Sequence, residues 1–117
     1  MTKKAVDMLN NYREGIEALT GTMPESVKAY NDFTGGAFED GEIEKAEKHR
    51  MALAIALKDG DEASITYHMD QCLGKGCSKE KIYEIMAVAS AYGGGSAMSR
   101  SIIKGIPIFE ELNAAKE

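Results

Sequence analysis

The sequence has no tryptophan, only two prolines and only two cysteines among its 117 residues, and it holds no long hydrophobic run. Its longest apolar stretch, Met51–Leu57, is far shorter than the roughly 18 residues that a membrane span needs. The start of the chain, Met-Thr-Lys-Lys-Ala-Val-Asp, lacks the apolar stretch of a secretory signal peptide. These absences predict a cytoplasmic protein without a membrane partner.

Positive charge is also in the minority. The 14 Lys and Arg residues face 19 Asp and Glu residues, which gives a net charge of −5. Nonspecific binding to nucleic acid depends on basic side chains that neutralise phosphates. Nucleic acid is therefore not expected as a partner.

The two cysteines, Cys72 and Cys77, have a spacing that fits neither a disulfide framework nor the Cys-x-x-Cys motif of zinc and redox sites. We expect two free thiols that act as small core residues, with side chains on different faces because the spacing crosses the end of a helix. Two imidazoles and one carboxylate would suit a transition metal, but their spacing matches no known metal signature. Neither a metal nor a cofactor is predicted.

Glycine is abundant, and the 12 glycines with the two prolines divide the chain into segments of helical length. Because apolar and polar residues nowhere alternate for long, we predict an all-α fold of about six helices in a single domain, residues 1–117. The expected helices are Lys4–Leu19, one from the capping box Thr22–Glu25 to Gly35-Gly36, Glu42–Leu57, Asp61–Leu73, Lys79–Tyr92 after a Ser78 cap, and one from Ser96 that is interrupted at Gly105–Pro107.

Two patterns indicate which surfaces the helices bury. The first two helices carry apolar stripes, including Tyr12, Tyr30 and Phe33, that are predicted to face the core. In Ala87–Ser101, Ala, Ser and Gly fill eleven of the fifteen positions, a composition that suits close approach of two backbones. That segment is either a packing seam within the chain or a subunit interface.

Candidate catalytic residues surround the turn between the third and fourth predicted helices. Asp61, Ser64 and His68 follow one another at i, i+3 and i+7, so they share one helix face, and His49 lies on the preceding helix. If the two helices pair antiparallel, all four residues converge on one cavity beside apolar surface. Partial desolvation there would shift a pKa toward a value suited to proton transfer. The alternative is that His68 is a hydrogen-bonded core histidine and His49 a surface one.

The stretch His49–Ala97, from His-Arg-Met-Ala-Leu-Ala through Gly-Cys-Ser-Lys-Glu to Tyr-Gly-Gly-Gly-Ser-Ala, resembles the carboxymuconolactone decarboxylase and alkylhydroperoxidase D-like (AhpD-like) family. The resemblance implies an all-α fold that assembles as a homo-oligomer, a trimer or hexamer, through helices around the active site. In the peroxidase branch, a Glu, a Cys-x-x-Cys pair and a His form a proton relay and a redox pair. Here those positions are His49, Asp61, Ser64 and His68, so only the final histidine matches.

The decarboxylase branch keeps that histidine without requiring the cysteine pair. The resemblance therefore implies an enzyme that binds a small-molecule substrate and performs acid–base, lactone decarboxylase-type chemistry, with His68, Asp61, His49 and Ser64 as the catalytic residues. Two alternatives remain, a thiol peroxidase as in the family's other branch and a noncatalytic oligomeric binding protein.

Overall fold

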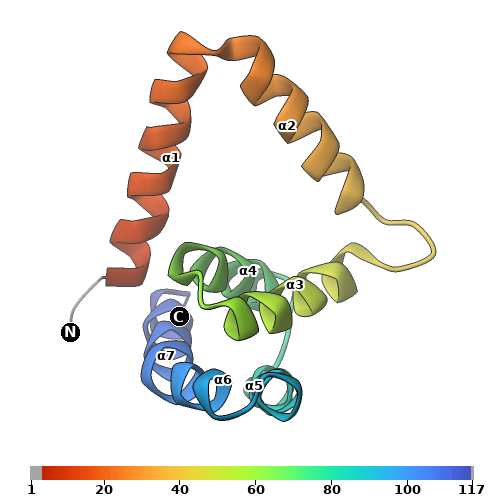
Figure 1. The fold of residues 1–117 in the computed structure, drawn as a ribbon, viewed down its shortest axis with the longest axis vertical. Coiled ribbons are helices and arrows are strands. Elements are labelled where there is room, and N and C mark those ends of the chain that lie inside the picture. The colour runs from red at the N-terminus through yellow and green to blue at the C-terminus, as the bar shows by residue number, and fades with distance from the viewer. Residues whose placement is uncertain (1–3, 117) are drawn as a thin grey trace.

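The computed structural model describes residues 4–116, and all of its regular elements are helices (Figure 1). They are α1 (Lys4–Thr22), α2 (Pro24–Ala37), α3 (Lys45–Asp59), α4 (Glu62–Gly74), α5 (Lys79–Gly93), α6 (Gly95–Arg100), the π-helical turn η1 (Ser101–Gly105) and α7 (Ile106–Ala115). The all-α prediction is confirmed. Among these helices, none combines the length and apolar character that a bilayer span requires.

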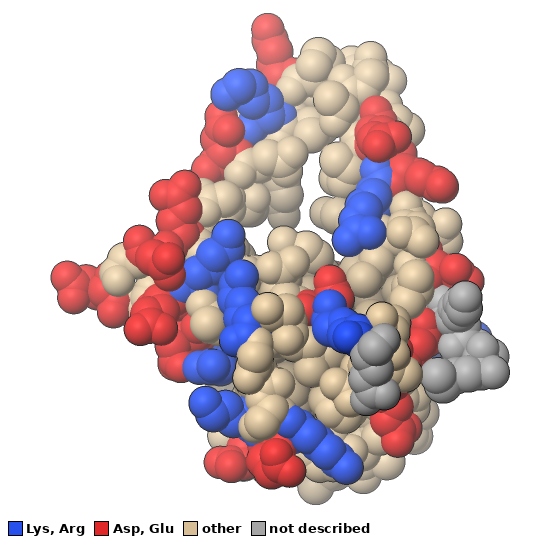
Figure 2. All heavy atoms as spheres, turned by 180° about the vertical axis from the view of Figure 1, so that it is seen from behind, with Lys and Arg blue, Asp and Glu red and all other residues tan. Residues whose placement is uncertain are grey.

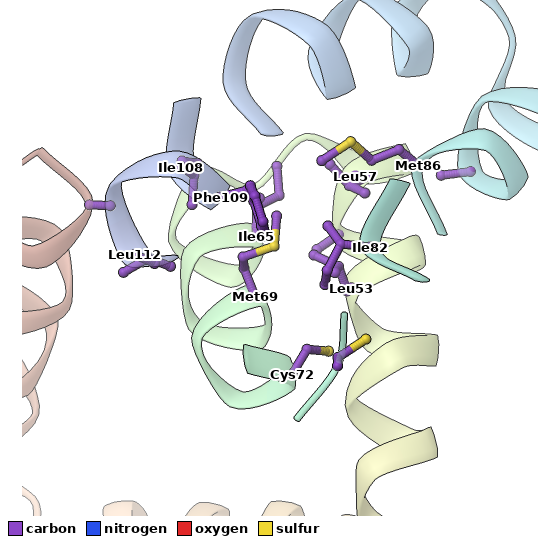
Figure 3. Close-up of a cluster of buried hydrophobic side chains, with 14 residues drawn as sticks. Leu53, Leu57, Ile65, Met69, Cys72, Ile82, Met86, Ile108, Phe109 and Leu112 are labelled. Atoms are coloured by element: carbon purple, nitrogen blue, oxygen red, sulfur yellow. The ribbon is translucent and has the colours of Figure 1, made fainter. Parts of the chain in front are cut away.

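Helices α3, α4, α5 and α7 share one hydrophobic core (Figure 3), and α3 packs against both α4 and α5. Leu53 and Leu57 of α3, Ile65 and Met69 of α4 and Ile82 of α5 have no exposed surface. Burying one such side chain stabilises a fold by about 2 kcal/mol. These five residues join the helices that position the candidate site.

The segment Gly105–Pro107 does not interrupt the last helix, contrary to the sequence prediction. Helices α6, η1 and α7 follow one another without a break. Proline is tolerated because the π-helical turn η1 directly precedes it: the N–H of Ile106 donates to the carbonyl of Ser101, five residues back, and this wider turn accommodates a ring that has no N–H. A Cβ at Gly105 would lie 3.1 Å from Met86 Cε and 3.4 Å from Leu57 Cδ2, so glycine also allows close packing here.

Helix α3 ends at a glycine, and a neighbouring arginine completes the turn. Gly60 adopts a left-handed conformation with φ 87°, and its N–H donates to the carbonyl of Ala56 at 2.7 Å. Arg100 Nη1 donates to the carbonyls of Leu57 and Lys58 at 2.7 and 2.9 Å, which satisfies two of the acceptors that a helix end leaves free. The next helix, α4, therefore folds back against α3.

Helices α1 and α2 form an arm that projects from the body as a wide hairpin (Figure 1). The base of the arm is fixed by Glu111 of α7, whose two carboxylate oxygens accept hydrogen bonds from the N–H groups of Ala5 and Val6 at 3.0 and 2.9 Å. Ala5 is the one residue of α1 that is fully buried. The rest of the arm depends on few contacts with the body.

The arm differs from the sequence prediction in two respects. Helix α1 continues through Gly21 to Thr22, and α2 begins after Met23, which makes no side-chain cap, so the expected capping box does not form. Tyr30 and Phe33 are not core residues: they are 62% and 76% exposed, and α2 has no buried residue. The core of this chain therefore does not cover these two side chains.

We predict that Glu111→Ala loosens the base of the arm and lowers the free energy of unfolding by about 1 kcal/mol, the usual effect of removing a helix cap. Because the carboxylate holds two N–H groups at the first turn of α1, amide hydrogen exchange should accelerate there. Urea unfolding and hydrogen-exchange mass spectrometry measure both effects. The matched control is Glu110→Ala, which removes an exposed carboxylate from the same helix. Equal behaviour of the two variants would contradict this role for Glu111.

Candidate active site

A cavity of about 800 Å³ lies between the arm and the helices α3 and α4. The space-filling view shows the molecule hollowed between the arm and the body (Figure 2). All four residues selected from the sequence line this cavity: His49 of α3, Asp61 just before α4, and Ser64 and His68 of α4. The structure thus brings them together, although their catalytic role stays a prediction.

The centre of the site is a pair of histidines. Nδ1 of His49 and Nδ1 of His68 lie 3.0 Å apart, within hydrogen-bonding distance. The pairing follows from the fold, because α3 and α4 run antiparallel from Gly60 and the two histidines lie at comparable distances from that turn. His49 is 2% exposed and is thus not the surface residue of the alternative interpretation.

The surroundings favour the uncharged form of both rings. Burial, the neighbouring His68 and the positive charges of Lys75 and Lys45 lower the pKa of His49 from 6.5 to about 4. Burial also lowers the pKa of His68. The pair is therefore neutral at physiological pH, which removes the repulsion that two imidazolium ions at this distance would cause.

A neutral pair has a defined distribution of hydrogens. One Nδ1 must carry a hydrogen and the other must accept it, because two N–H groups or two lone pairs cannot form the bond between His49 and His68. The donating ring then has an unprotonated Nε2, and the accepting ring carries its hydrogen on Nε2. The pair thus has one Nε2 that can accept a proton and one that can donate a proton.

Two aromatic side chains enclose the histidines. Phe38, directly after α2, stacks on His49 and His68 with ring centroids 4.6 and 5.4 Å apart. Tyr67 meets the same two rings edge-on, at 6.1 and 5.0 Å. These rings fix the imidazole planes and keep water from their faces, which accounts for the desolvation that lowers both pKa values.

Asp61 and Ser64 interact mainly within the first turn of α4. The Asp61 carboxylate accepts a hydrogen bond from the N–H of Ala63 at 3.2 Å and one from Ser64 Oγ at 2.7 Å. Asp61 is therefore the N-cap of α4, a role that explains an aspartate at this position without reference to catalysis. Within residues 4–116, no group of three His, Cys, Asp or Glu side chains is arranged to hold a metal ion.

The sequence analysis missed the contribution of the arm and of Phe38. The cavity wall includes Tyr12, Arg13 and Tyr30 from the arm and Lys45 from the start of α3. Tyr12 and Tyr30 were predicted as core residues because an apolar stripe has the same periodicity whether it faces a core or a cavity. No short motif marks Phe38, which reaches the histidines only because the loop after α2 returns to α3.

The fold and the site define an all-helical domain with an enclosed histidine pair, and comparison with known proteins gives its family. The chain belongs to the carboxymuconolactone decarboxylase family, whose model matches residues 24–103. This match includes α2 to α6 and extends into η1, so it contains all four candidate residues.

Individual relatives share less than a third of their residues with this chain. An uncharacterised protein of Cupriavidus necator is 29% identical over 97% of this chain and 100% of its own length. The 4-carboxymuconolactone decarboxylase of Acinetobacter baylyi is 24% identical over 91% of this chain and 92% of its own. A carboxymuconolactone decarboxylase family protein from Legionella pneumophila has the same fold, with a TM-score of 0.89, 21% identity and coverage of 95% of this chain and 98% of that one.

We predict that the histidine pair makes the folded state sensitive to mild acid. Because the pKa of His49 is about 4 in the folded chain and 6.5 otherwise, the unfolded chain binds more protons between these values. The free energy of unfolding therefore falls as the pH falls through this window.

Urea unfolding of the parent and of His49→Gln at several pH values measures this contribution. Other titrating groups act in both proteins, so the difference between the two curves isolates the histidine. The variant should lose less stability than the parent on acidification. Parallel curves would show that His49 has an ordinary pKa in the folded state.

Proposed function

We propose that this chain is a carboxymuconolactone decarboxylase-like enzyme that binds a small organic molecule in the cavity and transfers protons with the His49–His68 pair. The observation that carries the proposal is the distance of 3.0 Å between the two Nδ1 atoms on the wall of a cavity of about 800 Å³. A histidine pair that served only the core would not need to face a space large enough for a substrate.

The neutral pair suits a reaction in which a proton leaves one atom of a substrate and another atom gains one. The unprotonated Nε2 of one ring removes the first proton, and the Nε2–H of its partner donates to the developing negative charge. Proton movement across the bond between His49 and His68 exchanges these roles. Both rings are thus neutral again after a turnover, with the proton acceptor and the proton donor exchanged.

The cavity wall also indicates the kind of substrate. Arg13 and Lys45 contribute positive charge, and Tyr12, Tyr30 and Phe38 contribute aromatic surface. This combination favours a small organic acid with an unsaturated or cyclic carbon frame. The named activity of the Acinetobacter relative, 4-carboxymuconolactone decarboxylase, concerns a molecule of this class, and we propose a lactone acid for this chain.

We also propose that the protein is a homo-oligomer, a trimer or hexamer, because the isolated chain leaves too much of its apolar surface uncovered. Helix α2 has no buried residue and contains Gly35 and Gly36, so in isolation it would be marginally stable. In Ala87–Ser101, Ala89, Ala97 and Ser101 are buried, which supports the packing seam. Apolar side chains of the body remain exposed both in this segment and outside it, namely Met51, Ile55, Val88, Tyr92, Met98, Ile102 and Ile103.

We predict that His68→Gln lowers kcat/KM on lactone acids by about 10²- to 10⁴-fold, the usual contribution of a general acid–base group. The substitution removes the proton acceptor and donor while it keeps a polar side chain of similar size. Steady-state kinetics and thermal unfolding are measured in parallel. The control is Asp70→Asn on the same helix, a residue that pairs with Lys116 and lies outside the cavity wall. A stability loss with unchanged turnover would make His68 a structural histidine.

A second prediction concerns assembly. Light scattering of the parent protein at micromolar concentration should give the mass of a trimer or hexamer. Phe33→Asp places a charge on a side chain that is 76% exposed in the single chain, so it should reduce the mass without unfolding the body. Asp32→Asn, an exposed neighbour, should leave the mass unchanged. A monomeric parent protein would refute the proposed assembly.

A further inference from the structure

Helix α4 ends in a turn that brings the two cysteines together. The N–H of Cys77 donates to the carbonyl of Cys72 at 3.0 Å, the N–H of Gly76 donates to that of Leu73 at 3.1 Å, and Gly76 is left-handed with φ 79°. These are the two hydrogen bonds of a Schellman motif, in which the residues that close the outer bond make a side-chain contact. The expectation that the cysteines lie on different faces is therefore wrong.

The two thiols lie on the same side of this turn. The backbone bond from the N–H of Cys77 to the carbonyl of Cys72 holds the two residues together, the Cys77 thiol influences the ionisation of Cys72, and both belong to the hydrophobic core cluster, where Figure 3 shows Cys72 at one end. Both cysteines are buried and belong to no disulfide. Because the outer hydrogen bond of the turn holds the two backbones close, a disulfide needs little movement of the chain.

Positive charge lies beside the pair. The Arg50 guanidinium, on α3, interacts with the Cys77 thiol and with the Glu47 carboxylate, and these contacts raise the pKa of Arg50. Its buried Nε has no hydrogen-bond partner within the described residues. The charge of Lys75 also acts on Cys72. Neighbouring cations favour a thiolate, the reactive form of cysteine.

The two sulfurs have different surroundings. Cys72 is 1% exposed, and burial together with the neighbouring Cys77 raises the pKa of the Cys72 thiol to about 12. Cys77 is 5% exposed, follows the turn and contacts Arg50. Cys77 is therefore the more accessible of the two sulfurs and the one with an arginine beside it.

We propose that Cys72 and Cys77 form an oxidisable dithiol, which a small hydroperoxide converts to an intrachain disulfide and an external dithiol restores. Neither sulfur belongs to the cavity wall, so this site is independent of the proposed acid–base function. It is also distinct from positions 61 and 64, where this chain has Asp and Ser.

The chemistry balances in two steps. The Cys77 thiolate attacks one oxygen of the hydroperoxide, the O–O bond breaks, and Cys77 becomes a sulfenic acid while the leaving oxygen takes up a proton as an alcohol or water. The sulfur of Cys72 then attacks the Cys77 sulfur, the S–O bond breaks, and the hydroxyl leaves as water with the thiol hydrogen of Cys72. Two electrons pass from the thiols to the peroxide.

The test uses the full-length reduced protein and one to two equivalents of hydrogen peroxide. We expect both thiols to disappear together, the intact mass to fall by about 2 Da for two lost hydrogens, and dithiothreitol to reverse the change. Trypsin cleaves after Lys75, between the cysteines, so the oxidised protein should yield peptide Asp59–Lys75 joined to Gly76–Lys79.

Variants then separate the two sulfurs. In Cys72→Ser, Cys77 should accumulate as a sulfenic acid that dimedone traps, and in Cys77→Ser, Cys72 should remain reduced. Arg50→Gln should slow the loss of thiols about tenfold because it removes the cation beside Cys77. Lys28→Gln, which makes the same change of charge on the arm, should react at the parental rate. Circular dichroism verifies that each variant is folded.

Three results would overturn the proposal. The first is thiols that persist in the folded parent protein while free glutathione in the same tube is oxidised. The second is a disulfide that links two chains instead of the two tryptic peptides. The third is an equal, independent rate of oxidation at both cysteines in the single variants. Peptide mapping of the parent protein decides the first two without any variant.

Discussion

The turn at Gly60 is the constraint on which the site depends. A left-handed residue closes α3 there, and a Cβ at this position would lie 2.7 Å from Nε of Arg100, so both the conformation and the space require glycine. The same arginine binds the last carbonyls of α3. Because this contact fixes the direction in which α4 leaves α3, it also fixes the register of the two helices, which places His49 opposite His68.

Once the two helices are paired, the chemistry of the histidines follows from packing. Phe38 covers one side of both rings and Tyr67 meets their edges, so the rings lose water and remain neutral. Two charged imidazoles could not share this space, whereas two neutral ones form a hydrogen bond. The aromatic enclosure thus determines the protonation state, and the protonation state determines that the pair has one basic and one acidic Nε2.

Sequence reasoning succeeded where local signals and tertiary structure agree. Ser78 caps its helix as predicted, and its side chain accepts a hydrogen bond from the N–H of Lys81. The convergence of His49 with His68 required only the antiparallel pairing across Gly60. Reasoning failed at Gly21, Gly35 and Gly105, because one glycine costs a helix only about 1 kcal/mol, which packing or a continuing helix can offset. The prediction that Tyr30 and Phe33 face the core was wrong for another reason: the periodicity of an apolar stripe does not reveal which surface covers it.

The relative position of the two cysteines depends on the turn between them and cannot be read from their spacing alone. Five residues along a continuing helix would point two side chains in different directions, but Gly76 reverses the chain so that Cys77 returns to Cys72. The signal was present in the sequence, as a glycine directly before the second cysteine at a predicted helix end. Helix α4 thus carries different chemistry at its two ends: its first turn uses Asp61 and Ser64 to start the helix, and its last turn holds the thiols. The proposed acid–base site and the proposed dithiol are separate because the histidines and the cysteines have different neighbours, Phe38 at His49 and Arg50 at Cys77.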